Sequence, residues 1–376
     1  MKFINPFEIF TYKGPEYFCD REEELEVLID AFDNRRNIVL AAPRKLGKTN
    51  LIYHLHHHLS KRKNTICIYM DVLFTASDEE FINSFITSVL NALSGKENII
   101  SKFSELFKNA RPEVGFDPIT NLPNFKINIS TPEEYRHSFD SIMNLLLARK
   151  ETIQIAIDEF QQIENYNQPS KIDALIRSYF PKAKNLHFIF SGSEAHLLNT
   201  LFRNHAKPLF SSTGWVELGL IGYDEYFQFI DRHFKANDIN VKDQEIYEIL
   251  KWTDGHTFYT HYLCNLIFLY GNKGYSNLVD YCKDKCLKEN QSSFFMYKRG
   301  LTTVQYEVLK AIAKENGVQS LTSKGFLSKY NLSATSAKRS TDTLLEKQFI
   351  RESYNEDVVT YIVNDIFLKR WIQAYQ

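Results

Sequence analysis

The chain has 376 residues, of which 44% are hydrophobic and 24% are charged, and this composition indicates a globular protein with room for two or three domains. Its formal charge is -1, from 45 basic and 46 acidic residues, which excludes a chain that is basic throughout. Any surface for nucleic acid therefore has to be local.

No apolar run approaches the roughly 18 to 20 residues that cross a bilayer, and residues 1–10 lack the pattern of a secretory leader. The 5 cysteines are odd in number and scattered, which fits a reducing compartment better than a disulfide framework. Cys282 and Cys286 lack the second ligand pair of a zinc site. We therefore expect a soluble, cytoplasmic protein with no membrane partner.

Residues 1–222 alternate short β-branched runs with longer helical patterns, which predicts an α/β fold with a parallel sheet covered by helices. Nearly continuous apolar runs predict neighbouring strands, buried on both faces, at 37–41, 65–71, 152–158 and 186–191. Helices are expected at 50–59, at 78–93 behind the N-cap Ser77, and from Pro132 to about residue 150 behind Thr131. Residues 111–130 carry prolines and a glycine, and they indicate an excursion from the core.

Two further domains are expected after the sheet. Residues 223–298 show only helical periodicity and predict an all-helical unit. Residues 299–376 combine expected helices at 303–315, 323–330 and 334–348 with alternating runs at 349–353 and 358–363. Three helices followed by a β-hairpin are the layout of a winged helix-turn-helix.

The strongest local signal follows the first expected strand. This segment matches the phosphate-binding loop G-x-x-x-x-G-K-[ST] at each defined position but the first, where alanine replaces glycine. It consists of Ala42, Pro43, Arg44, Lys45, Leu46, Gly47, Lys48 and Thr49, with Asn50 next in the following helix. In such a loop backbone N–H groups surround the β-phosphate, the lysine reaches the β- and γ-phosphates, and the threonine hydroxyl binds Mg²⁺. We therefore expect these residues to bind ATP and Mg²⁺.

A second element agrees with the loop. The strand expected at 152–158 ends in Asp158 and Glu159, as a Walker B motif does. Asp158 is expected to hold Mg²⁺ through water, and Glu159 to orient and polarise the attacking water. Ser191 and Ser193 follow the neighbouring strand, and they either contact the γ-phosphate or the attacking water or are plain turn residues.

Several segments together resemble a known family. They are Phe18-Cys-Asp-Arg-Glu-Glu-Glu24, the Pro-Arg pair of the phosphate loop, Asp158-Glu-Phe-Gln161, Phe190-Ser-Gly-Ser193 and Thr253-Asp-Gly-His256. Over about residues 15–290 the chain resembles the archaeal-type ATPases, which belong to the AAA+ and STAND group of P-loop NTPases and are similar to origin-recognition initiators.

The resemblance implies a P-loop ATPase core at 1–222, a helical lid at 223–298 and a winged helix at 299–376. It also implies that adenine lies near Asp20, Arg21 and Glu22, with the nucleotide between core and lid.

The sequence departs from the family pattern in two places. Many relatives carry an arginine after Pro-Leu-Tyr-Gly that can serve as an arginine finger, but this chain has Pro208-Leu-Phe-Ser-Ser212. Arg203 is the nearest substitute, with a surface arginine as the favoured interpretation. Where relatives often have Gly-Gly-x-Pro, this chain has Asp254-Gly-His-Thr257. His256 is a candidate second sensor, although a helix-capping loop explains the same residues.

The expected recognition helix of the winged helix carries Thr335, Ser336, Lys338 and Arg339, residue types that contact phosphates and base edges. The whole block has only a small excess of basic residues, so docking to protein stays open beside DNA. The run from His54 to His58 lacks a third metal ligand, and we interpret it as partly exposed helix surface.

These patterns favour a Mg²⁺-dependent ATPase that acts as a slow or partner-stimulated switch controlling a protein or DNA interaction. Two alternatives stay open: a winged-helix DNA-binding regulator or initiator gated by ATP, and a nucleotide-binding scaffold that does not hydrolyse. A kinase is disfavoured because the acid pair stands where water is activated and no acceptor site is evident. Self-association stays open, since nucleotides in this group often lie near a subunit boundary.

Overall fold

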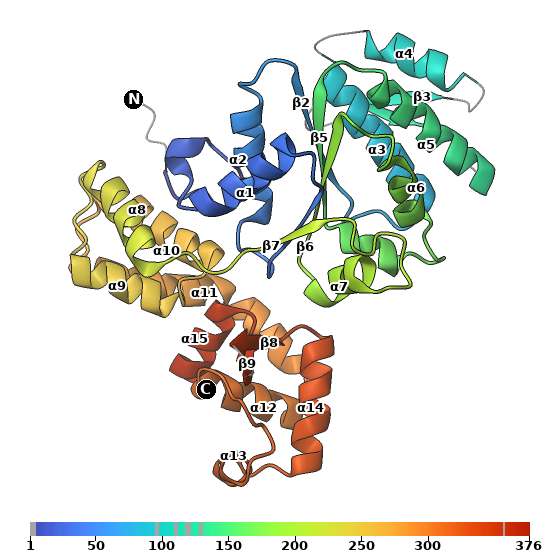
Figure 1. Cartoon of the computed structure of the whole chain (residues 1–376). Helices are drawn as coiled ribbons and strands as arrows, with labels where there is room; N and C mark the ends of the chain where they lie inside the picture. Colours follow the sequence, from blue (N-terminus) through green and yellow to red (C-terminus); the bar gives the residue numbers. More distant parts are fainter. Residues whose placement is uncertain (1–4, 95–97, 109–111, 117–121, 128–130, 356–357) are drawn as a thin grey trace. The chain divides into compact units, whose positions relative to one another are not determined.

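The computed structural model describes residues 5–94, 98–108, 112–116, 122–127, 131–355 and 358–376 (Figure 1). It contains two compact units, one formed by residues 11–220 and the other by residues 5–10 together with 221–376. Among the residues it describes, no helix is both long and apolar enough to cross a membrane.

The first unit is built on a parallel five-stranded sheet with the order β2-β5-β6-β1-β7. The strands are β1 (Ile38–Ala41), β2 (Thr65–Asp71), β5 (Thr152–Asp158), β6 (Leu186–Gly192) and β7 (Gly214–Glu217). The four predicted strands are confirmed, with ends that agree to within one residue. Strand β7 was missed because its four residues include a glycine and a glutamate and form no apolar run.

Helices cover both faces of this sheet (Figure 1). Side chains such as Ile38 and Leu40 pack against α1 (Glu22–Asp33) and α2 (Lys48–Leu59). Val39, on the opposite face, belongs to the larger core with the remaining helices, α3 (Asp78–Leu93), α5 (Pro132–Leu147), α6 (Ile172–Tyr179) and α7 (Ala195–Arg203). Burial on both faces explains why β1, β5 and β6 are nearly continuous apolar runs, whereas buried and half-buried residues alternate along β2 at the edge of the sheet.

Helices α3 and α5 begin directly after the N-cap residues that the sequence predicted. The Ser77 hydroxyl accepts a hydrogen bond from the Glu80 N–H, and Thr131 forms a capping box with Glu134. Helix α5 ends at Leu147, a few residues before the predicted end.

The predicted excursion is a small attachment beside α3. Its described part is an antiparallel hairpin of β3 (Glu113–Phe116) and β4 (Pro123–Lys126), and α4 (Ile99–Leu106) precedes it. Phe125 is buried against Phe103, and Thr87 of α3 donates a hydrogen bond to the Phe125 carbonyl. Parts of the excursion, at 111, 117–121 and 128–130, lie outside the described residues.

The second unit begins with helices α8 (Tyr223–Lys235), α9 (Asp243–Trp252), α10 (Thr257–Tyr270) and α11 (Leu278–Arg299). The segment 5–10 packs on them: Phe7 is fully buried beside Phe229 and Phe234, and the Asn265 amide donates to the Phe7 carbonyl. No sequence pattern had indicated this association of the N-terminal segment with the helical unit.

The predicted winged helix is confirmed. It consists of α12 (Thr303–Lys314), α13 (Lys324–Tyr330), α14 (Ala334–Glu346) and the antiparallel strands β8 (Ile350–Asn355) and β9 (Val358–Val363). A further helix, α15 (Ile366–Tyr375), was not predicted. Its Trp371 is buried against Phe294 of α11, so α15 joins the winged helix to the preceding helices within this unit.

Candidate nucleotide and catalytic site

The phosphate loop joins β1 to α2 through a turn with two left-handed residues. Lys45 has φ 66° and Gly47 has φ 98°, and such backbone is natural for glycine and uncommon for lysine. Gly47 is the N-cap of α2 and provides no side-chain cap. The first N–H groups of α2 are therefore left for another acceptor, as in an anion site at a helix N-terminus.

Lys48 lies in this turn with only 5% of its surface exposed. Its Nζ donates a hydrogen bond to the Ala42 carbonyl at 3.2 Å. Burial lowers the pKa of Lys48, and the nearby Glu159 and Asp158 carboxylates oppose this shift. An ammonium group has three donors, and among the described residues only the Ala42 carbonyl accepts a hydrogen bond from Lys48, so the site fits an anionic group such as a phosphate.

Asp158 accepts hydrogen bonds from hydroxyl groups on three different elements. Its Oδ2 accepts hydrogen bonds from Thr49 Oγ1 at 2.6 Å and from the Tyr69 hydroxyl at 3.0 Å, and its Oδ1 accepts one from Ser191 Oγ. The two residues expected to hold Mg²⁺ thus meet, although 109 positions separate them. Hydroxyl and carboxylate oxygens are ligands that suit Mg²⁺. Sequence reasoning missed Tyr69, because a tyrosine within a strand gives no signal of this role.

Glu159, the next residue, also accepts two hydrogen bonds. It has φ 54°, and its Oε2 accepts hydrogen bonds from Gln161 Nε2 at 2.5 Å and from Ser193 Oγ at 2.9 Å. Strand β6 lies next to β5, as expected, so Ser191 reaches one acid and Ser193 the other. The two serines therefore donate hydrogen bonds to the acid pair. Gln161 stands in the motif that carries the family resemblance, but the sequence assigned it no role.

The other predicted site residues of this unit are buried in the core, half-buried or exposed at the surface. Leu46 is buried in the core between the sheet and α1 and α2, while Pro43 and Asn50 are half-buried. Arg44 is exposed and pairs with Glu194 at 3.3 Å. The exposed Arg203 places its guanidinium 4.1 Å from the centre of the Trp215 ring.

Arg21, expected near adenine, is buried. Its guanidinium donates to Glu24 Oε1 and to the Gly219 carbonyl, both at 2.7 Å. These bonds connect the start of α1 to the segment after β7, which is a structural role for this side chain.

Comparison with known families agrees with this geometry. The profile described as an ATPase domain predominantly from Archaea matches residues 18–263, well over half of the chain. The chain belongs to this archaeal ATPase family. A second profile, described as a probable winged helix domain, matches residues 292–374.

Solved structures show the same fold. The chain is similar to a Walker-type ATPase of Pyrococcus abyssi, with 18% identity and a TM-score of 0.66 over 98% of this chain and 99% of the other. It is also similar to the ORC2 protein of Aeropyrum pernix, solved as ADPNP-ADP complexes, with 12% identity and a TM-score of 0.60 over 99% and 98% of the two chains. The ORC1 protein of Aeropyrum pernix in complex with DNA has 11% identity and a TM-score of 0.51 over 96% and 94%. None of the curated proteins matches the sequence.

In the second unit of this archaeal-type ATPase, the segment Thr253-Asp-Gly-His256 is a helix-to-helix turn. The Gly255 N–H donates to the Leu250 carbonyl at 2.8 Å, and Asp254 takes the left-handed conformation with φ 51°, as in a Schellman cap of α9. His256 is buried and is the N-cap of α10. The helix-capping interpretation of these residues is thus confirmed, and a sensor role for His256 stays a prediction.

The interpretation of the histidine run as partly exposed surface is wrong for His54. His54 is only 8% exposed, and its ring stacks on Phe18 with 4.3 Å between the two ring centres. Its Nδ1 is 2.7 Å from the Tyr12 hydroxyl. Burial, with positive neighbours, lowers the pKa of His54 to about 4. The helix α2 was correctly predicted, but the segment 12–18 that covers this face has no periodic signal.

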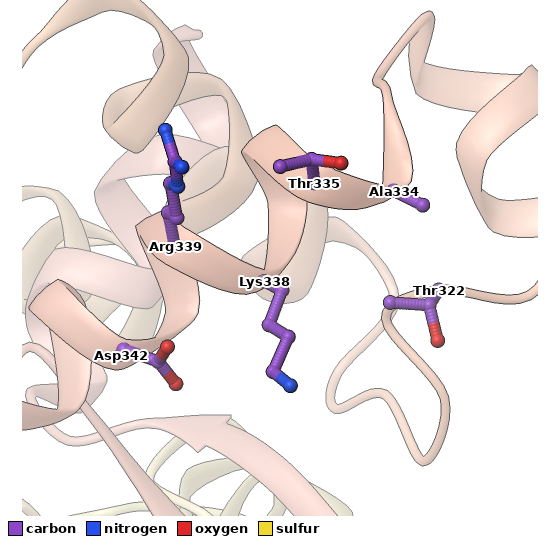
Figure 2. A pocket seen from close by; sticks show the side chains of 6 residues that line it. All are labelled: Thr322, Ala334, Thr335, Lys338, Arg339 and Asp342. Carbon is purple, nitrogen blue, oxygen red and sulfur yellow. The ribbon is translucent and has the colours of Figure 1, made fainter.

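Helix α14 presents three of the four expected contact residues to solvent. Thr335, Lys338 and Arg339 are exposed, whereas Ser336 is half-buried and its backbone N–H donates to the hydroxyl of the N-cap Ser333. A hollow of about 450 Å³ is lined by Thr322, Ala334, Thr335, Lys338, Arg339 and Asp342. Figure 2 shows Lys338 extending from the helix on the side of the loop that carries Thr322, whereas Arg339 leaves it in another direction.

Proposed function

We propose that this chain binds ATP with Mg²⁺ at residues 42–50 and hydrolyses it as a slow, nucleotide-controlled switch. The observation that carries the proposal is the hydrogen bond between Thr49 and Asp158, beside the buried Lys48 ammonium. It joins the phosphate loop to the strand end that bears Glu159. The similar ORC2 protein, solved as ADPNP-ADP complexes, supports the choice of nucleotide.

Each residue then has a role that its position supports. The N–H groups at the start of α2 and Lys48 neutralise phosphate charge, and Thr49 and Asp158 hold the metal ion. When bound, Mg²⁺ supplies additional neutralisation of charge on the phosphate oxygens. Glu159 accepts a hydrogen bond from the attacking water and aligns it.

Lys48→Ala is expected to weaken ATP binding by about 100-fold or more, because the buried cation that faces the phosphates is removed. Calorimetric titration with ATP and Mg²⁺ measures this loss. Lys61→Ala, which removes an exposed lysine just beyond α2, is the matched control and should bind like the wild type. Absence of ATP binding by the wild type would refute the proposal, and binding without turnover, with or without DNA, would favour the scaffold alternative.

A second candidate function is DNA binding through α14. The exposed Lys338 and Arg339 on the second long helix of a winged helix favour it. The similar ORC1 protein was solved in complex with DNA. A protein partner or a second copy of this chain on the same face is the competing assignment.

Replacing Lys338 and Arg339 together by glutamine is expected to weaken binding to duplex DNA about equally for all sequences. Each lost phosphate contact should reduce the slope of log affinity against log salt by about one. Fluorescence anisotropy over a salt series measures both effects. Lys314→Gln, an exposed charge at the end of α12, is the control. If the wild type shows no salt-dependent DNA binding, the assignment of DNA to α14 is wrong and a protein partner is favoured.

A further inference from the structure

Gln161 is a polar residue beside the acid pair that the proposed reaction does not otherwise employ. It lies in the 3-10 helix η2 (Phe160–Asn165), two residues beyond Glu159, and is 3% exposed. Its Nε2 donates a hydrogen bond to Glu159 Oε2 at 2.5 Å. We infer that Gln161 is a positioning residue that orients Glu159 toward the attacking water, an inference that rests on the proposed hydrolysis.

The backbone explains how the two side chains meet. Glu159 precedes η2 in the left-handed conformation, and this reversal lets the side chain two residues later return to the carboxylate. The hydroxyl of Ser193 donates to the same oxygen, Oε2, from the end of β6. Two donors on one oxygen fix the orientation of the carboxylate, and within the described residues no donor is hydrogen-bonded to Oε1. Glu159 thus has one anchored oxygen and one available to a water.

Gly192 provides the space that this arrangement requires. A Cβ atom at position 192 would lie 2.0 Å from Gln161 Oε1, so a side chain there and this position of the amide exclude one another. Gln161 Oε1 is buried and has no hydrogen-bond partner among the described residues. The Gln161 amide therefore donates to Glu159 through Nε2, while its Oε1 stays without a donor among the described residues.

Gln161→Met tests the inference, because methionine fills a similar volume without a donor. We expect kcat for ATP hydrolysis to fall about 10-fold or more, since the base loses its alignment, with ATP affinity within about twofold of the wild type. The matched control is Gln162→Met, which removes the neighbouring amide, one that donates to the Thr75 carbonyl instead and should leave kcat unchanged.

Two further variants separate positioning from a structural role. Gly192→Ala displaces the Gln161 amide and should also lower kcat while ATP still binds. In a Glu159→Gln background, Gln161→Met should cause no additional loss in single-turnover assays, because the residue acts through Glu159.

The outcomes are distinguishable. Gln161→Met with wild-type kcat, or a loss that adds in full to that of Glu159→Gln, overturns the inference and leaves the proposed function intact. A wild type that does not hydrolyse ATP overturns both.

Discussion

Glu159→Gln is expected to lower ATP turnover by about 100-fold or more while ATP binding stays within about twofold of the wild type. The substitution keeps the shape of the side chain but replaces a carboxylate with a neutral amide, which is a much weaker acceptor for a water proton. Binding should persist because the phosphate contacts belong to the turn at Gly47 and to Lys48, whose hydrogen bond goes to the Ala42 carbonyl. Steady-state phosphate release and nucleotide titration measure the two quantities separately.

Glu133→Gln is the matched control for this variant, because it removes the charge of an exposed glutamate in the first turn of α5. It should leave turnover and binding unchanged. Turnover by Glu159→Gln at the wild-type rate would show that another group activates the water, and the assignment of the second acid of the pair would then be wrong. A simultaneous loss of binding would indicate that the substitution disturbs the loop rather than the chemistry.

The fold of the first unit was predictable where burial imposes a simple pattern. Strands β5 and β6 are buried between two layers of helices, so their sequences are nearly continuous apolar runs with sharp ends. Strand β7 has one buried residue among four, Val216, and such an edge strand leaves no periodic trace. Helix α15 was missed for another reason: it follows a hairpin that already completed the expected winged-helix layout.

The site was predictable where a motif links residue type to ligand chemistry. Lys48, Thr49 and Asp158 were assigned from spacing and strand order, and the structure brings all three together. Tyr69 was not predicted, and Gln161 was noted only as part of the family motif. The roles of both depend on which side chains of neighbouring elements meet in three dimensions. The same limit applied to Ser191 and Ser193, which were correctly placed beside the acids but whose partners only the structure distinguishes.

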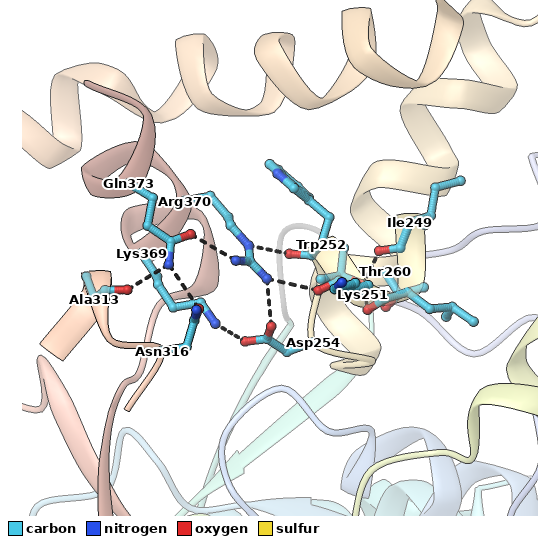
Figure 3. A network of polar contacts seen from close by, with 12 residues as sticks. Ile249, Lys251, Trp252, Asp254, Thr260, Ala313, Asn316, Lys369, Arg370 and Gln373 are labelled. Carbon is cyan, nitrogen blue, oxygen red and sulfur yellow. Dashed lines mark hydrogen bonds and ion pairs between the residues drawn. The ribbon is translucent and has the colours of Figure 1, made fainter. Parts of the chain in front are cut away.

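The second large effect is expected at Arg370, whose replacement by methionine should destabilise the unit formed by residues 5–10 and 221–376 by about 2–4 kcal/mol. Its guanidinium donates to the Trp252 carbonyl at 2.7 Å, to the Lys251 carbonyl at 2.9 Å and to Asp254 Oδ1 at 2.7 Å (Figure 3). Two of these acceptors are carbonyls at the end of α9. Methionine leaves them without this donor and leaves the Asp254 carboxylate to Lys369 alone.

The hydrogen bonds around Arg370 connect α15 to the end of α9 and to the end of α12. Gln373 accepts a hydrogen bond from Arg370 and donates to the Ala313 carbonyl at the end of α12 (Figure 3). The α9 turn and the winged helix are thus connected through one helix that sequence analysis did not predict. Loss of the guanidinium should weaken that connection as well as the cap of α9.

Thermal unfolding followed by circular dichroism measures the effect, with a melting point that should fall by several degrees. Arg370→Lys should be intermediate, because an ammonium keeps the charge opposite Asp254 but cannot supply the fork of donors to two carbonyls as well. Arg299→Met is the control, since it removes an exposed arginine at the end of α11 and should melt like the wild type. If Arg370→Met melts with that control, the α9 turn is held by its own left-handed cap at Asp254 and Gly255, and α15 only rests against it.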